Sequence, residues 1–266
     1  MLMTPIHFVF IIPSHNNADW YQYNIESIAK QKCNNWRAIY VDDASTDNTL
    51  NLVRKYVSEL GLTKKFTYIQ NPKKLGPAGS RYQAYTQTKD NEICCMLDGD
   101  DWLYGDSVLN ILNEQYCAGY NCTYGCYLTV NAKCAAVKLR EINPGGRAWP
   151  PNDYPDKVHQ RRYYRNIANE RFFASHMRTM QSKLIKDINV DKYLKLDNKW
   201  IQVSTDMAEM FYVLEKKETK HKFINRPIYV YNAYNSKRYI TSWYRRNETP
   251  ETKEYREKIM NFIKNV

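Results

Sequence analysis

Residues 92–101, EICCMLDGDD, form an apolar run of strand length that ends in three aspartates within four residues. Two earlier segments follow the same plan. Residues 7–12, HFVFII, precede PSHNN, and residues 36–41, WRAIYV, precede DDASTD. Residues 66–70, FTYIQ, form a fourth run with the length and the β-branched or aromatic content of a strand. We therefore expect four strands in the first hundred residues.

Helical patterns separate these strands. Between the second and third strands, apolar residues recur at spacings of three, four and three, as on one face of a helix, namely at Leu50, Val53, Val57 and Leu60. We also expect helices over about 21–32 and 77–88. The alternation of strands and helices predicts an α/β fold with a parallel sheet, in which ligands bind beyond the carboxyl ends of the strands.

The pattern is less regular in the second half of the chain. We expect a helix over about 106–116, then strands over 120–130 and 133–139 outside the parallel set. Residues 141–165 are rich in proline and glycine, which predicts a long irregular loop that serves as a lid or binding loop, with a plain linker as the alternative. Residues 250–264 predict a last amphipathic helix that packs on the core.

Composition and charge narrow the function classes. The 266 residues are 43% hydrophobic and 25% charged, which excludes disordered, collagenous and coiled-coil chains. The net charge of +11 is compatible with nucleic acid, an anionic membrane or an acidic small substrate. Residues 1–134 contain 12 basic and 13 acidic side chains, whereas residues 135–266 contain 27 and 15, so the positive charge belongs to the second half.

The start of the chain lacks a long apolar segment. Its longest uncharged apolar run, residues 8–12, is too short for a signal sequence or a membrane span. We expect a soluble, cytoplasmic protein without an integral membrane segment, with peripheral contact of the basic half with a membrane surface as an open alternative. Seven cysteines, two of them adjacent at Cys94 and Cys95, indicate reduced thiols and not a disulfide framework.

Carboxylates gather at the expected carboxyl ends of the strands. Asp98, Asp100 and Asp101 would repel one another unless a hard divalent cation neutralised them, and an Asp-x-Asp turn can hold Mg or Mn while it leaves positions open for phosphate oxygens. The alternative is a solvated acidic turn before a helix. Asp42 or Asp43 could accept hydrogen bonds from a base or ribose.

The segment GPAGSR, residues 76–81, opens the helix after the third strand. Its backbone N–H groups and the Arg81 guanidinium could both face an anion. The spacing G-x-G-x-x-G and a P-loop are both absent from the sequence, so neither a dinucleotide site nor a P-loop site is supported.

Four segments in this order resemble family 2 glycosyltransferases of the GT-A fold: FVFIIPSHN (8–16), VDDASTD (41–47), GPAGSR (76–81) and LDGDD (97–101). The resemblance implies a single GT-A (Rossmann-like) domain over 1–266, with a mixed central sheet flanked by helices. Residues 1–103 would bind the nucleotide sugar and residues 104–266 the acceptor.

The resemblance also implies a nucleotide-diphosphate sugar donor, with a UDP-sugar favoured, an Mn or Mg ion, and inversion at the anomeric carbon. Asp98 would meet the ribose or sugar, and Asp100 would bind the metal. The implied donor-binding residues are Pro13, Ser14, His15, Asp42, Asp43, Arg81, Asp98 and Asp100. His15 stands where the family often has Tyr, and Gly99 where Ser or Ala is common.

The catalytic base is expected in the second half, at Asp206 in the segment STDMAEM (204–210), where Thr205 replaces the acid that usually precedes it. The alternative is a carboxylate that only complements the helix dipole. Further candidates for acceptor or diphosphate contacts are His176, Arg178, Lys237 and Arg238, although a histidine beside aromatic residues is often a packed core residue.

Three other functions are open for this sequence. A sugar-phosphate nucleotidyltransferase would need a glycine-rich basic loop after the first strand, and residues 13–17 contain none. A nucleic-acid binder is supported by the interleaved aromatic and basic residues over 229–246. A GT-A domain that binds its donor without turnover is the third. We favour transfer to a glycan, lipid-linked or protein hydroxyl in polysaccharide or glycoconjugate synthesis, with no nucleic-acid partner.

Overall fold

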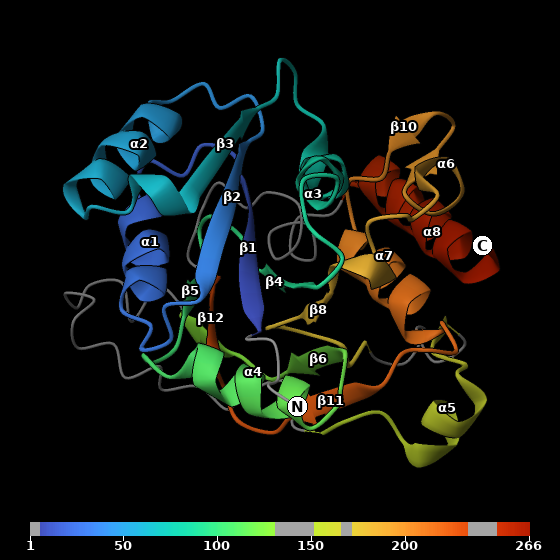
Figure 1. Cartoon of the computed structure of the whole chain (residues 1–266). Coiled ribbons are helices and arrows are strands. Elements are labelled where there is room, and N and C mark those ends of the chain that lie inside the picture. Colours follow the sequence, from blue (N-terminus) through green and yellow to red (C-terminus); the bar gives the residue numbers. More distant parts are fainter. Residues whose placement is uncertain (1–5, 131–151, 166–171, 234–248) are drawn as a thin grey trace.

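A computed structural model describes residues 6–130, 152–165, 172–233 and 249–266 (Figure 1). The four strands and three helices predicted for the first hundred residues are confirmed. In chain order these elements are β1 (His7–Ser14), α1 (Tyr21–Ala29), β2 (Trp36–Asp42), α2 (Thr49–Glu59), the short 3-10 helix η1 (Thr63–Lys65), β3 (Phe66–Gln70), α3 (Gly76–Tyr85) and β4 (Glu92–Met96).

The second half contains shorter elements. They are β5 (Trp102–Leu103), α4 (Val108–Cys117), β6 (Cys122–Gly125), β7 (Leu128–Val130), α5 (Asp156–Arg161), β8 (Thr179–Gln181), η4 (Ser182–Leu184), α6 (Val190–Tyr193), β9 (Lys195–Leu196), β10 (Lys199–Trp200), α7 (Thr205–Leu214), β11 (His221–Ile224), β12 (Tyr229–Asn232) and α8 (Pro250–Asn265). The helices expected over 106–116 and 250–264 are confirmed as α4 and α8.

Two expectations for the second half need correction. The strand expected over 120–130 is two strands, because the chain leaves one sheet after β6 and enters another at β7. The described part of the segment expected as irregular loop contains the helix α5, which follows Pro155 and has Asp156 in its first turn, where a negative charge complements the helix dipole. The strand expected over 133–139 lies outside the described residues.

Within the described residues, seven strands form a mixed sheet in the order β11-β6-β8-β4-β1-β2-β3. Strands β4, β1, β2 and β3 run parallel, and β8 is antiparallel to both β4 and β6. The predicted α/β class with a mixed sheet is therefore confirmed, and the sheet contains strands from both predicted halves. A smaller sheet has the order β5-β12-β7, and β9 pairs with β10 as a hairpin.

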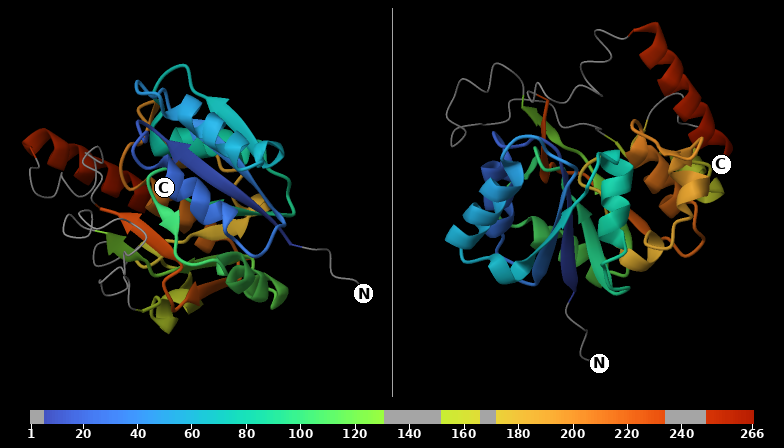
Figure 2. Two further views of the ribbon diagram at one scale, coloured as in Figure 1. Left: turned by 90° about the vertical axis from the view of Figure 1, so that its left-hand side faces the viewer. Right: turned by 90° about the horizontal axis from the view of Figure 1, so that it is seen from above.

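The central strands are apolar on both faces because helices cover both (Figures 1 and 2). Along β1, Phe8, Phe10 and Ile12 pack with residues of α1, α2 and α4. The alternate residues Val9 and Ile11 pack with residues of α3, α7 and α8. All five are fully buried, and burial of each large apolar side chain contributes about 1.5–3 kcal/mol, so this strand anchors the sheet.

The described helices were also compared with the length and apolarity that a bilayer span requires. None of the helices in the described ranges is both long and apolar enough to cross a membrane. The cysteines in these ranges are free thiols, and Cys94 and Cys95 are buried in β4.

Candidate active site

The ends of β1, β2 and β4 meet at one edge of the sheet. Ser14 at the end of β1 lies beside Asp42 at the end of β2 in the strand register. The Ser14 hydroxyl accepts a hydrogen bond from Tyr40 (2.7 Å), and the Gly99 amide donates to the Pro13 carbonyl (2.9 Å). A Cβ at Gly99 would lie 2.7 Å from both Cβ and Oγ of Ser14, so only glycine lets the turn after β4 approach this closely.

Asp42 has one carboxylate oxygen that lacks a hydrogen-bond donor among the described residues. Its Oδ2 accepts a hydrogen bond from the Ser45 amide (3.2 Å), whereas Oδ1 is buried and accepts none from the described residues. The residue is 1% exposed. A buried acceptor without a donor is unfavourable by about 1–3 kcal/mol, so an N–H or O–H group of a ligand would stabilise this position.

Asp43 has a different role from its neighbour. Its carboxylate accepts hydrogen bonds from the amides of Leu75 and Gly76 (2.8 Å each) and from the Asn71 side chain (2.9 Å). The first N–H group of the 76–81 segment, that of Gly76, was expected to be available to an anionic ligand and instead binds Asp43. His15 lies beside it and its Nδ1 is 2.8 Å from the Asp43 carbonyl oxygen.

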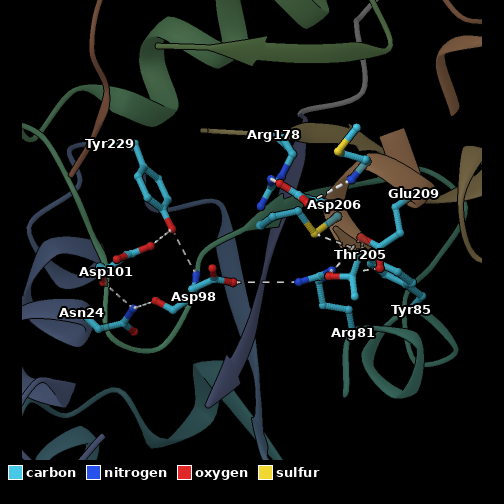
Figure 3. A network of polar contacts seen from close by, with 12 residues as sticks. Asn24, Arg81, Tyr85, Asp98, Asp101, Arg178, Thr205, Asp206, Glu209 and Tyr229 are labelled. Atoms are coloured by element: carbon cyan, nitrogen blue, oxygen red, sulfur yellow. Dashed lines mark hydrogen bonds and ion pairs between the residues drawn. The ribbon is translucent and has the colours of Figure 1, made fainter. Parts of the chain in front are cut away.

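The acidic turn after β4 is held from several sides. Asp101 is fully buried, and its carboxylate accepts hydrogen bonds from the Tyr229 hydroxyl (2.6 Å) and the Asn232 amide (2.8 Å). The Asn24 side chain donates to the carbonyls of Asp98 (3.0 Å) and Asp101 (2.8 Å), as Figure 3 shows. Asp101 therefore shapes the turn.

The two other carboxylates of the turn lie at the same edge as Asp42. The side chain of Asp98 is 28% exposed, and Asp100 is 6% exposed. Burial raises the pKa of Tyr40, and the charges of Asp42, Asp47 and Asp100 raise it further.

Arg81 is the centre of a buried network that the sequence did not indicate. Its Nε donates to both carboxylate oxygens of Glu209 (3.0 and 2.9 Å), and its Nη2 donates to the Thr205 hydroxyl (2.6 Å). Its Nη1 lies 4.0 Å from Asp98 Oδ1. Tyr85 also donates to Glu209 (3.1 Å). Burial opposes the charge of Arg81, but Glu209 outweighs it and holds the pKa of Arg81 above its usual range.

Asp206 lies in the first turn of α7, directly after Thr205. Its Oδ2 accepts a hydrogen bond from Arg178 (2.7 Å), and its Oδ1 accepts one from the Met207 amide (3.0 Å). The Asp206 side chain is 33% exposed, whereas Arg178 is 4% exposed. The Arg178 carbonyl accepts a hydrogen bond from Met96 at the end of β4 (3.0 Å). Asp206 is thus held by Arg178, whose backbone pairs with the end of β4 just before the acidic turn (Figure 3), and its side chain is partly exposed.

His176 is packed among aromatic rings. It stacks on Tyr229 with ring centroids 4.5 Å apart, and Tyr127 meets it edge-on at 5.4 Å. Because Tyr229 also binds Asp101, this aromatic cluster supports the acidic turn. Lys237 and Arg238 lie outside the described residues. Whether His176 or Arg178 contacts an acceptor stays a prediction.

Sequence reasoning missed Glu209 and Tyr229. The spacing between Asp206 and Glu209 places both on one face of α7, which was the available signal for Glu209. Nothing near Tyr229 in the sequence indicates that it would reach an aspartate 128 residues away.

The carboxylates of the turn after β4 are the candidates to bind a divalent cation. No cluster of three or more metal-binding side chains occurs in the described ranges. Asp101 is engaged by Tyr229, and Asp98 and Asp100 are the other two carboxylates of the turn, with Asp98 Oδ1 4.0 Å from Arg81 Nη1. Mg is usually held by one or two carboxylates together with substrate phosphates, so this pair fits such an ion.

Comparison with known proteins decides the family. The sequence model of the family described as glycosyl transferase family 2 matches residues 9–188, which is more than half of the chain. The chain belongs to glycosyl transferase family 2. This family match covers the expected strands and acidic turns of the first half and extends to η4.

Two relatives are named as sugar transferases. The chain is 26% identical over 137 residues to dTDP-rhamnosyl transferase RfbG of Shigella flexneri, which covers 50% of this chain and 43% of that protein. It is 32% identical over 98 residues to poly(ribitol-phosphate) beta-N-acetylglucosaminyltransferase TarS of Staphylococcus aureus, which covers 36% of this chain and 16% of that protein. The matches thus span less than half the length of these relatives.

Solved structures confirm the GT-A fold. A crystal structure of S. aureus TarS in complex with UDP superposes with a TM-score of 0.59 and 19% identity over 85% of this chain and 60% of that one. A mannosyltransferase from Pyrobaculum calidifontis in complex with GDP-Man and Mn²⁺ gives a TM-score of 0.58 and 12% identity over 98% of this chain and 69% of that one.

Proposed function

We propose that this chain moves a sugar from a nucleotide-diphosphate donor to a hydroxyl group of an acceptor, with inversion at the anomeric carbon. One observation carries the proposal: Asp42, whose buried Oδ1 lacks a donor among the described residues, lies at the same edge of the sheet as the turn that contains Asp98 and Asp100. The Asp42 acceptor suits an N–H group of a nucleobase, and the acidic turn suits a diphosphate that carries a cation.

Asp206 acts as the base in this proposal. Its carboxylate takes the proton of the acceptor hydroxyl while that oxygen attacks the anomeric carbon from the side opposite the leaving diphosphate. One C–O bond forms as the bond between the sugar and the diphosphate breaks, so the configuration inverts. The support is positional, because Arg178 and the first turn of α7 fix a solvent-accessible carboxylate near the acidic turn.

Asp100, with Asp98, would hold an Mn or Mg ion. Bound there, the ion would neutralise negative charge on the leaving diphosphate. The other side of the donor would rest on the loops that follow β1 and β2, where Pro13, Ser14 and His15 lie. The names and bound ligands of similar proteins include UDP, dTDP and GDP nucleotides, so we propose a UDP-sugar first and test all three classes.

Donor binding is tested by thermal unfolding with Mn and UDP-, dTDP- or GDP-sugars. We expect one donor class to raise the melting temperature, and Asp100→Ala to abolish this shift. Asp106→Ala is the matched control, since Asp106 is an exposed carboxylate further along the same segment that pairs with Lys32. If no nucleotide sugar stabilises the protein with or without metal, the donor hypothesis fails.

The base is tested separately with Asp206→Asn. This variant should keep the donor-induced shift in melting temperature and lose at least about 100-fold in slow donor hydrolysis or transfer, because general-base catalysis contributes 10²–10⁴-fold. Transfer that survives at the wild-type rate would place the base elsewhere. Retained donor binding without hydrolysis in the wild type would favour the non-catalytic GT-A domain.

A further inference from the structure

A groove with a volume of about 640 Å³ lies beside the donor edge and is not used by the chemistry above. Its walls are the loop between β3 and α3, the β9–β10 hairpin and one face of α8. In Figure 1 the loop is at the top centre, and β10 and α8 lie to its right. This volume is in the range of pockets that bind small molecules. The groove is lined mainly by lysines and aromatic rings, namely Lys73, Lys74, Lys199, Lys258, Trp200 and Tyr255.

The charge of the groove is positive and largely uncompensated. Lys73, Lys74 and Lys199 are exposed and form no ion pair within the described ranges. Lys258 pairs with Asp197 at 2.7 Å, but both side chains are more than half exposed, so this pair contributes only about 0–1 kcal/mol. Four ammonium groups around one hollow repel one another, and an anionic ligand would relieve that repulsion.

Two aromatic side chains of the groove, Trp200 and Tyr255, are held by contacts with their neighbours. The Trp200 ring packs against α3, where a Cβ at Gly79 would lie 3.2 Å from it and the Tyr82 ring centroid lies 5.9 Å away. Tyr255 is 38% exposed, and its hydroxyl accepts a hydrogen bond from the Gln202 amide (3.2 Å). Lys195 Nζ lies 5.1 Å from the centroid of the Trp200 ring. Aromatic rings suit the C–H face of a sugar, and a ring that is already held by its neighbours loses less entropy on binding.

The groove adjoins the proposed reaction site on two sides. Gln202 lines it and also donates to the Leu75 carbonyl (3.0 Å), and the Leu75 amide binds Asp43 at the donor edge. Gln202 precedes Asp206 by four residues, so their Cα atoms are at most about 14 Å apart. The groove and the proposed base are therefore close along the chain and in space.

We propose that this groove binds an anionic saccharide chain, one that carries phosphate or carboxylate groups, and presents it as the acceptor. The acceptor role rests on the proposed glycosyl transfer, but the binding itself does not. Lysine ammonium groups contact the anions, and Trp200 and Tyr255 contact the sugar rings. Neutral saccharides lack the first set of contacts.

The test is direct binding to the full chain by calorimetry without any nucleotide sugar. The probes are a glycerol-phosphate oligomer, an oligogalacturonate, a neutral dextran oligomer of equal length and inorganic phosphate. We expect at least one of the two charged oligomers to bind, with an affinity that falls as salt rises, because exposed charges are screened. The phosphate and carboxylate oligomers together identify which anion is preferred.

Matched variants locate the site. Replacing Lys73, Lys74 and Lys199 with Gln should weaken oligomer binding at least about fivefold, because three exposed ion pairs with the ligand are lost. Replacing Lys183, Lys217 and Lys220 with Gln changes the net charge equally outside the groove and should have less than a twofold effect.

The proposal fails if neither charged oligomer binds, or if the neutral oligomer or inorganic phosphate binds as tightly as the charged oligomers. It also fails if both triple variants weaken oligomer binding equally. Tighter binding of a single-stranded DNA of the same charge would likewise overturn it. Loss of donor binding alone would refute the glycosyl transfer and leave the groove assignment intact.

Discussion

The buried pair between Arg81 and Glu209 gives the most quantitative prediction. Both side chains are less than 5% exposed, and Glu209 accepts two contacts from Arg81 Nε and one from Tyr85. The substitution Glu209→Gln keeps the size of the side chain and removes its charge. Arg81 then remains buried and charged, in contact only with neutral acceptors, the amide oxygen at position 209 and the Thr205 hydroxyl, while Asp98 lies 4.0 Å away.

Breaking a buried ion pair from one side destabilises a protein by about 3–5 kcal/mol. In a domain of this size each kcal/mol lowers the melting temperature by roughly 2–4 °C, so we expect a decrease of about 6–20 °C. The pair joins α3 to α7. The loss should therefore also loosen the first turn of α7, where Asp206 lies.

The free energy of unfolding is measured by urea denaturation of both the variant and a control. Glu59→Gln is the control, because Glu59 forms an exposed pair with Lys55 at 3.9 Å one helical turn away. Its effect should be about 0–0.5 kcal/mol. The double variant Arg81→Met with Glu209→Leu should recover much of the lost stability, since it removes both buried charges. A cost below about 1 kcal/mol for Glu209→Gln would refute this account of the pair.

Three further predictions concern single positions. Gly99→Ala should destabilise by about 1–3 kcal/mol in urea unfolding, because its methyl would lie 2.7 Å from Ser14; a neutral effect would show that the turn can move. Tyr229→Phe removes a donor to buried Asp101 and should cost about 1–3 kcal/mol and weaken Mn-dependent donor binding; unchanged values would contradict its positioning role. Burial lowers the pKa of His221 from 6.5 to about 4. As the pH falls, the unfolded chain therefore binds a proton at this position before the folded chain does. The contribution of His221 should lower the free energy of unfolding by about 2 kcal/mol between pH 7 and pH 5. His221→Asn should reduce that pH dependence. If the variant and the wild type show the same dependence of unfolding free energy on pH, His221 is not its source.

Much of the first half could be predicted from local patterns. The apolar runs along β1 and β4 have the length and composition of strands buried on both faces, and the spacing of Leu50, Val53 and Val57 is that of a helix. The short strands β9 and β10 and the helix α5 have too few residues for a period to emerge. The break between β6 and β7 follows from sheet pairing, which is not visible in the sequence.

The sequence by itself determined the order of strands and acidic turns, and with it the family, because strand and helix periods and the residues that follow each strand are local properties. Only the tertiary structure decided which of those acids are available. Asp43 and Asp101 are engaged by backbone amides and Tyr229, whereas Asp42 Oδ1 has no donor in the described part of the chain. The partners lie up to 131 residues apart. Contacts over such separations depend on how the elements pack, and the local periodicity of the sequence does not specify them.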